Sequence, residues 1–169
     1  MRSLFIYHTF NLQGDAIVSF CGACDVSLNN MVDQEDVKLK APIYSRSMLH
    51  FLGEFFDDDL EKTILRQRLL MASILECLRK EASSVPWMRA GDDIYVGKLK
   101  VSVSIATKSP VSTLIHAGIN IETKDTPVPT FGLEQANVDP KVLSGEVLFR
   151  FKEEMEGIGL ARCKVRGVP

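Results

Sequence analysis

The stretch Lys100-Val101-Ser102-Val103-Ser104 predicts a β-strand, and so does His116-Ala117-Gly118-Ile119-Asn120. Apolar residues alternate with polar or small ones in both stretches, and successive side chains of a strand point to opposite faces. One face is then expected to carry Lys100, Ser102, Ser104, His116, Gly118 and Asn120. Solvent-facing strands usually carry longer charged side chains, so small polar groups around a lysine predict the floor of a binding site.

The segment between these two strands is turn-like, which predicts an antiparallel hairpin. If the apolar faces of both strands coincide, the pairing is restricted, because a one-residue slip turns every side chain over. The expected pairs are Lys100 with Asn120, Ser102 with Gly118, and Ser104 with His116. In this register Gly118 leaves an open space beside Ser102, as glycines in strands often do where a ligand approaches.

The composition predicts an ordinary globular protein. The chain has 169 residues, is 46% hydrophobic and carries a net charge of −2, so we expect a single domain spanning residues 1–169. The small net charge gives no reason to expect a nucleic-acid partner. Apolar runs stay far below the roughly 20 residues that span a bilayer. We therefore expect no membrane partner and a cytoplasmic location.

A Cys-x-x-C spacing occurs at Cys21 and Cys24. A thioredoxin-type site needs a helix that begins at the first sulfur, whereas the residues that follow are turn-like. A zinc site needs a second ligand pair, and Cys77 and Cys163 are isolated in the sequence. We favour ordinary reduced cysteines at a strand end, with metal or redox chemistry as the alternative.

The rest of the chain predicts an α+β fold, an antiparallel-rich mixed sheet with helices packed against it. Strands are expected over residues 2–8, 14–20, 92–96 and 162–168, and irregular chain over 21–44 and 123–138. A short helix from Ser45 to Phe55 would place Arg46 one turn before His50, where both could bind an anion. Longer helices are expected over residues 60–82 and from Asp139-Pro140 to about Glu156.

The order of these segments resembles the catalytic domain shared by biotin protein ligases, lipoate ligases and octanoyl transferases. Gly91-Asp92-Asp93-Ile94-Tyr95-Val96 stands where that superfamily has an Asn-Asp strand, and the Lys100 strand resembles the lipoate-ligase Lys-Val-Ser-Gly-Ser. Over much of the chain the resemblance is closest to a prokaryotic family, domain of unknown function 366. This closer likeness includes Gly14-Asp15-Ala16-Ile17-Val18, Tyr44-Ser45, Met48-Leu49-His50-Phe51 and Arg66-Gln67-Arg68-Leu69-Leu70.

The sequence also departs from the superfamily pattern. Residues 21–50 contain neither the Gly/Arg-rich loop of biotin ligases nor the Gly-rich segment of lipoate ligases. Val103 replaces the glycine of the lysine motif. Phe131-Gly132 stands where octanoyl transferases have a Cys-Gly nucleophile, so a thioester route is not expected.

The resemblance implies roles for the residues of the predicted strip. Lys100 would neutralise the substrate carboxylate and the α-phosphate while an acyl adenylate forms, and His116 would act as a general acid or base. Ser102, Ser104, Gly118, Asn120, Arg46 and His50 would bind the substrate. ATP and Mg²⁺ are the implied cofactors, with Asp92, not Asp93, expected on the Lys100 face as the magnesium ligand.

Three functions remain open from the sequence. The first is a ligase-like protein that binds a carboxylate or acyl adenylate over the Lys100/His116 face and adenylates or transfers an acyl group. The second is a non-catalytic module that retains the pocket. The third is a structural or regulatory homodimer that pairs through exposed sheet edges.

Overall fold

The computed structural model of the chain describes residues 1–40 and 42–168. Its strands form a four-stranded sheet, ordered β1-β2-β7-β6, and a three-stranded sheet, ordered β3-β4-β5. All neighbouring strands in both sheets are antiparallel. The elements are α1 (Phe5–Phe10), β1 (Ala16–Val26), η1 (Leu28–Asn30), α2 (Gln34–Leu39), β2 (Ile43–Phe55), α3 (Leu60–Glu81), β3 (Trp87–Ala90), β4 (Asp93–Val96), β5 (Leu99–Lys100), β6 (Ser102–Lys108), β7 (Thr113–Asn120), α4 (Leu133–Ala136) and α5 (Pro140–Cys163).

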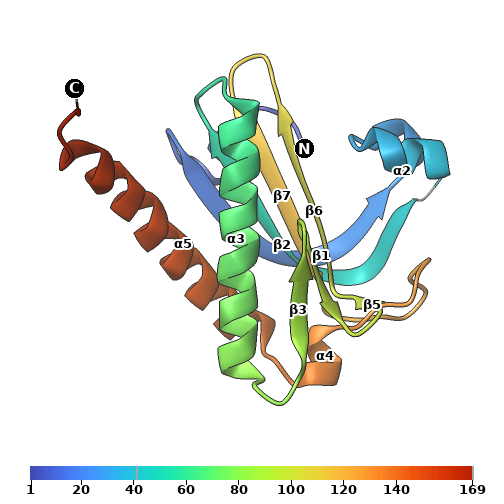
Figure 1. Cartoon of the computed structure of the whole chain (residues 1–169). Coiled ribbons are helices and arrows are strands. Elements are labelled where there is room, and N and C mark those ends of the chain that lie inside the picture. Colours follow the sequence, from blue (N-terminus) through green and yellow to red (C-terminus); the bar gives the residue numbers. More distant parts are fainter. Residues whose placement is uncertain (41, 169) are drawn as a thin grey trace.

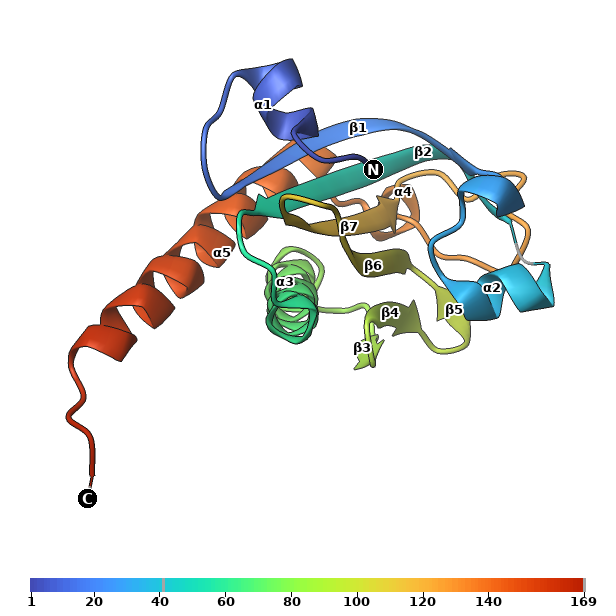
Figure 2. The same ribbon diagram turned by 90° about the horizontal axis from the view of Figure 1, so that it is seen from above.

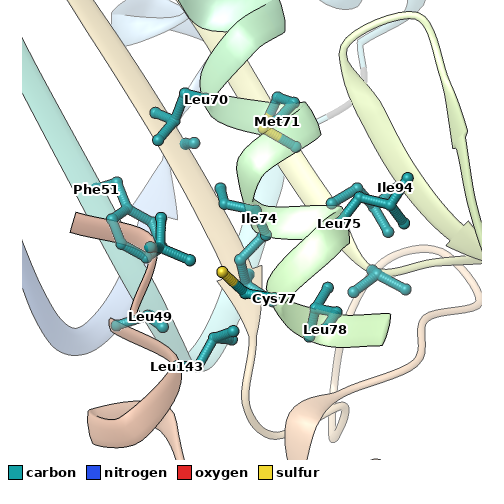
Figure 3. Close-up of a cluster of buried hydrophobic side chains, with 14 of the residues drawn as sticks. Leu49, Phe51, Leu70, Met71, Ile74, Leu75, Cys77, Leu78, Ile94 and Leu143 are labelled. Atoms are coloured by element: carbon teal, nitrogen blue, oxygen red, sulfur yellow. The ribbon is translucent and has the colours of Figure 1, made fainter. Parts of the chain in front are cut away.

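The two long helices pack with the second sheet against one face of the four-stranded sheet, and α1 lies over the other face (Figures 1 and 2). The core between α3, α5 and the sheet is drawn in Figure 3. It includes Leu49 and Phe51 from β2, Ile74 and Leu78 from α3, and Leu143 from α5. The expected α+β architecture, antiparallel-rich with helices packed on the sheet, is confirmed.

Helix α3 begins where the sequence predicts it. Asp59 is the N-cap, and its Oδ1 accepts a hydrogen bond of 2.9 Å from the Lys62 backbone N–H. The hydroxyl of Thr63 donates to that of Thr113 at 2.6 Å, which joins the first turn of α3 to β7. Within the described residues, no helix combines the length and apolar character needed to cross a bilayer.

Four other expectations about local structure are wrong. Residues 43–55 form strand β2, not a helix, and residues 5–10 form helix α1 where a strand was expected. Helix α5 continues to Cys163, so the expected closing strand is absent from residues 162–168. The expected irregular segments contain the end of β1, η1, α2 and α4.

Strand β2 escaped prediction because both of its faces are covered. Leu49 and Phe51 enter the helix-packed core, while Met48 and His50 are buried on the opposite face. A strand that is apolar on both faces lacks the alternation of a half-buried strand, so its period does not distinguish it from a helix.

The register between β6 and β7 differs from the expected one by a single residue. Ser102 pairs with Ile119 and Ser104 with Ala117, so both serines share the helix-packed face with those apolar residues. His116, Gly118 and Asn120 point to the opposite face by strand alternation. The expectation that serines and histidine form one strip is therefore wrong.

The serines lie on the core side because partners there satisfy their hydroxyls. Ser102 Oγ accepts a hydrogen bond of 2.8 Å from the Ile94 backbone N–H and donates to Asp93. Ser104 Oγ donates to the Asp92 carbonyl at 2.8 Å and accepts from the Gln67 amide at 2.7 Å. These bonds join β6 to β4 and α3, so a buried serine costs little here.

Replacing Ser102 with alanine tests this assignment. The substitution leaves the buried Ile94 N–H without its acceptor, so we expect the free energy of unfolding to fall by about 1–3 kcal/mol. Urea titration followed by circular dichroism measures this loss. Ser84→Ala, at an exposed position after α3, is the control and should change stability by less than about 0.5 kcal/mol. A Ser102→Ala protein as stable as the wild type would contradict the assignment.

Candidate functional site

Lys100 lies at the end of β5, outside the four-stranded sheet. Its Nζ is 2.8 Å from Asp93 Oδ2, and the lysine side chain is 33% exposed. Burial raises the pKa of the Asp93 carboxyl, and the Lys100 ammonium opposes that rise. The backbone of Lys100 is also held, because its N–H donates to Pro129 and its carbonyl accepts from Phe131, both at 3.0 Å. The structure thus holds the backbone of Lys100 in place and sets its ammonium beside Asp93.

Asp93, and not the Asp92 expected on the Lys100 face, is the aspartate that contacts the Lys100 ammonium. Asp92 instead lies 3.3 Å from Arg68, with the Gln67 amide at 3.5 Å. Among the described residues, no group of three or more His, Cys, Asp or Glu side chains is arranged to hold a metal ion. Both aspartates face cations, and the role of Asp92 as a magnesium ligand stays a prediction.

A pair of histidines from β2 and β7 lies on the face opposite the long helices. His50 Nδ1 and His116 Nε2 are 2.9 Å apart, and the rings stack with centroids at 5.2 Å. Phe20 of β1 stacks on the other side of His50, at 4.9 Å between centroids. The sequence did not reveal this pair, because it depends on residues 43–55 forming a strand beside β7.

Both histidines are neutral near pH 7. Burial, with smaller effects from His50 and the chain's amino terminus, lowers the pKa of His116 from 6.5 to about 3. Burial also lowers the pKa of His50. Removing an imidazolium from water is costly, so the neutral rings are favoured.

The hydrogen bonds assign the protons of this pair. His50 Nε2 lies 3.3 Å from the Gly22 carbonyl, which can only accept. A neutral His50 therefore carries its proton on Nε2 and accepts from His116 Nε2–H at Nδ1. His116 in turn keeps an unprotonated Nδ1, which is the basic atom of the pair.

The structure does not bring Arg46 and His50 together as expected. On a strand, four residues span about 13 Å rather than one helical turn. Arg46 instead forms an exposed ion pair with Asp125. The shared anion site expected of a helix is therefore wrong, and the binding roles of these two residues remain predictions.

Gly118 serves packing between strands and leaves no open space beside Ser102. It pairs with Val103 and with His50. A Cβ at Gly118 would lie 2.9 Å from Met48 Sδ and 3.3 Å from Val103 Cγ2. The glycine therefore lets the Met48 side chain cross this part of the sheet face.

Asn120 connects the two groups of candidate residues. It follows His116 and Gly118 on the same face of β7, and its amide donates to the Lys100 carbonyl at 3.4 Å. His116 and Asn120 are separated by about 13 Å along the strand. The structure therefore places the histidine pair and Lys100 at two ends of one stretch of β7, and not side by side.

The N-terminal segment closes the histidine face at one end. Glu54, only 1% exposed, accepts hydrogen bonds of 2.7 Å from the Leu4 N–H and the Ser112 hydroxyl. A cavity of about 20 Å³ lies between this segment, β2 and β7, which is room for about one water molecule.

Cys21 and Cys24 belong neither to the histidine pair nor to the Lys100–Asp93 ion pair. Cys21 and Cys24 both lie within β1, the first exposed and the second buried, and both are free. Burial raises the pKa of the Cys24 thiol, which disfavours the reactive thiolate.

The neutral histidine pair predicts a pH-dependent stability. In the unfolded chain His50 and His116 each bind a proton near pH 6.5, whereas in the folded protein His116 binds its proton only near pH 3. The contribution of the neutral histidines to the free energy of unfolding is therefore fully present above pH 6.5 and is lost as the pH falls toward 3. In urea titrations between pH 6.5 and 4.5, His116 alone should lower stability by up to about 1.4 kcal/mol per pH unit.

His116→Gln should reduce this slope, because glutamine does not titrate. His8→Gln, on exposed α1, is the matched control and should retain the wild-type slope. Equal slopes for His116→Gln and the wild type would contradict a His116 that is neutral in the folded protein near pH 5.

Comparison with known proteins identifies relatives over nearly the whole chain. Residues 1–166 match the family model described as Domain of unknown function (DUF366). An uncharacterised protein of Methanocaldococcus jannaschii is 37% identical over 165 residues, which cover 94% of this chain and 74% of that protein. A solved protein of unknown function from Pyrococcus horikoshi is also 37% identical, with a TM-score of 0.91 over 99% of this chain and 90% of that chain.

Two solved ligases share the fold at lower identity. The putative lipoate protein ligase of T. acidophilum with bound lipoic acid is 14% identical, with a TM-score of 0.62 over 89% of this chain and 77% of that chain. The biotin protein ligase of Aquifex aeolicus in complex with biotin and ATP is 22% identical, with a TM-score of 0.52 over 64% of this chain and 50% of that chain. The chain therefore belongs to the family described as domain of unknown function 366, and its fold is that of biotin and lipoate protein ligases.

Proposed function

We propose that this protein binds a small carboxylate or its acyl adenylate along β7, between the histidine pair and Lys100. The observation that carries the proposal is that Asn120, about 13 Å along β7 from His116, donates a hydrogen bond to the backbone carbonyl of Lys100. An extended acyl group fits such a length. Lipoic acid and biotin, the ligands of the two ligases with this fold, are carboxylates of this kind.

In the proposed complex Lys100 contacts the anionic end of the ligand. Its ammonium would leave Asp93, whose raised pKa reflects a buried carboxyl that tolerates loss of its charge. Fixed positive charge stabilises the negative charge that develops when a carboxylate oxygen attacks the α-phosphorus of ATP and pyrophosphate leaves. His116 supplies an uncharged hydrogen-bond acceptor at the other end of the site.

A non-catalytic binding module is the second candidate. Two observations favour it: Asp93 already neutralises Lys100, and residues 21–50 contain no Gly-rich phosphate loop. In this case the ligand binds in the same place, but no nucleotide is cleaved. The candidates therefore agree on ligand binding and differ only in pyrophosphate release.

Calorimetric titration of the protein with stable analogues of lipoyl and biotinyl adenylate tests the shared part of the proposal. We expect one analogue to bind, and Lys100→Ala to weaken its affinity at least about tenfold, or ~1.4 kcal/mol. Lys98→Ala, two residues away in the exposed turn between β4 and β5, is the charge-matched control and should bind like the wild type. If neither analogue binds, or if both lysine variants bind equally well, the proposal is wrong.

Release of pyrophosphate from ATP, with lipoic acid or biotin present, distinguishes the two candidates. An adenylating enzyme releases pyrophosphate only when its acid is added, and Lys100→Ala abolishes that release. A protein that binds an analogue but releases no pyrophosphate with either acid is the binding module.

A further inference from the structure

Helix α5 is longer than the body of the protein that supports it. Its first half is anchored by Leu143, Val147 and Phe151, each at most 1% exposed. Beyond Phe151, side chains 152–163 are exposed apart from the half-buried Met155. Figures 1 and 2 show this second half projecting away from both sheets and from α3. Three turns of helix therefore extend into solvent.

The apolar stripe of α5 continues into this projecting half. Leu143, Val147 and Phe151 recur every four residues on the buried side. Met155 and Ile158 follow at the next spacings of four and three, so they lie on the same side of the helix. Ile158 is 48% exposed. The face that packs on the body thus has an apolar extension beyond the body.

The projecting half is a poor helix on its own. Isolated helices shorter than about 12–15 residues are marginal in water. This segment also contains Gly157 and Gly159, and glycine is a much poorer helix former than alanine in a helix interior. At neither glycine does another atom approach within 4 Å of the missing Cβ position. A packing partner along the Met155–Ile158 stripe would stabilise these turns.

The charges around Ile158 indicate what that partner is. Glu154 lies one turn before Ile158 and Arg162 one turn after it, so both flank the apolar stripe. If two copies of the helix cross antiparallel at Ile158, Glu154 of each copy comes within reach of Arg162 of the other. A parallel pairing would set glutamate against glutamate and arginine against arginine.

We propose that the projecting half of α5 pairs antiparallel with the same segment of a second copy of this chain, around a two-fold axis at Ile158. An isologous contact of this kind is self-complementary. It differs from sheet-edge pairing, and it is independent of the proposed ligand site. Three turns of helix bury less than the roughly 1,200 Å² of a standard interface, so the dimer should dissociate in the micromolar range.

Sedimentation velocity from about 2 to 500 µM, at low salt, tests the pairing. We expect a monomer–dimer equilibrium for the wild type. Glu154→Arg and Arg162→Glu should each weaken the dimer at least about tenfold, because each creates like-charge contacts. The double variant, Glu154→Arg with Arg162→Glu, should restore the dimer, which only reciprocal pairing predicts.

Leu160→Asp is the matched control. Leu160 is 71% exposed and lies on the opposite side of α5 from the stripe, so this variant should dimerise like the wild type. A wild-type monomer at 500 µM overturns the proposal. A dimer that survives both single charge reversals, or that Leu160→Asp abolishes, also overturns it. All of these side chains are exposed, so unfolding does not obscure the result.

Discussion

Pairing of β7 with neighbours on both sides is the constraint on which the rest of the structure depends. Once Ile115 and Ile119 enter the helix-packed core, alternation assigns His116 and Asn120 to the other face. The registers with β2 and β6 then determine which side chains join each face. The histidine pair, the packing around Gly118 and the burial of Ser102 all follow from this arrangement.

The sequence predicts the features that local chemistry determines. Alternation identifies β6 and β7, and Asp59 and Asp139 mark the starts of α3 and α5, where each caps the backbone. The register of β6 on β7, in contrast, is not determined by local chemistry. It depends on whether a buried serine finds a partner, and for Ser102 that partner is the backbone N–H of Ile94, in the other sheet. The sequence pattern of β6 alone does not indicate such a partner.

The arrangement of the candidate residues was therefore not predicted, and their roles in binding or catalysis stay predictions. Lys100 and His116 are where the expected strands place them along the chain. Their surroundings differ, because Lys100 belongs to the small sheet with Asp93, while His116 contacts His50 of a strand that resembled a helix. Interactions between distant segments decide both environments. The polar pattern in the sequence therefore indicated the strands correctly, but it wrongly placed the serines and His116 on one face.

The order of protons in the histidine pair limits what the pair can do. The chain of hydrogen bonds ends at the Gly22 carbonyl, which is not a base and cannot receive a proton. A proton that reaches His116 Nδ1 therefore has no onward path through His50. It would stay on His116 as an imidazolium and leave again from the same nitrogen atom. The pair therefore cannot pass a proton on through His50. Its hydrogen bonds are better suited to orienting His116 Nδ1 as an acceptor than to relaying protons to solvent.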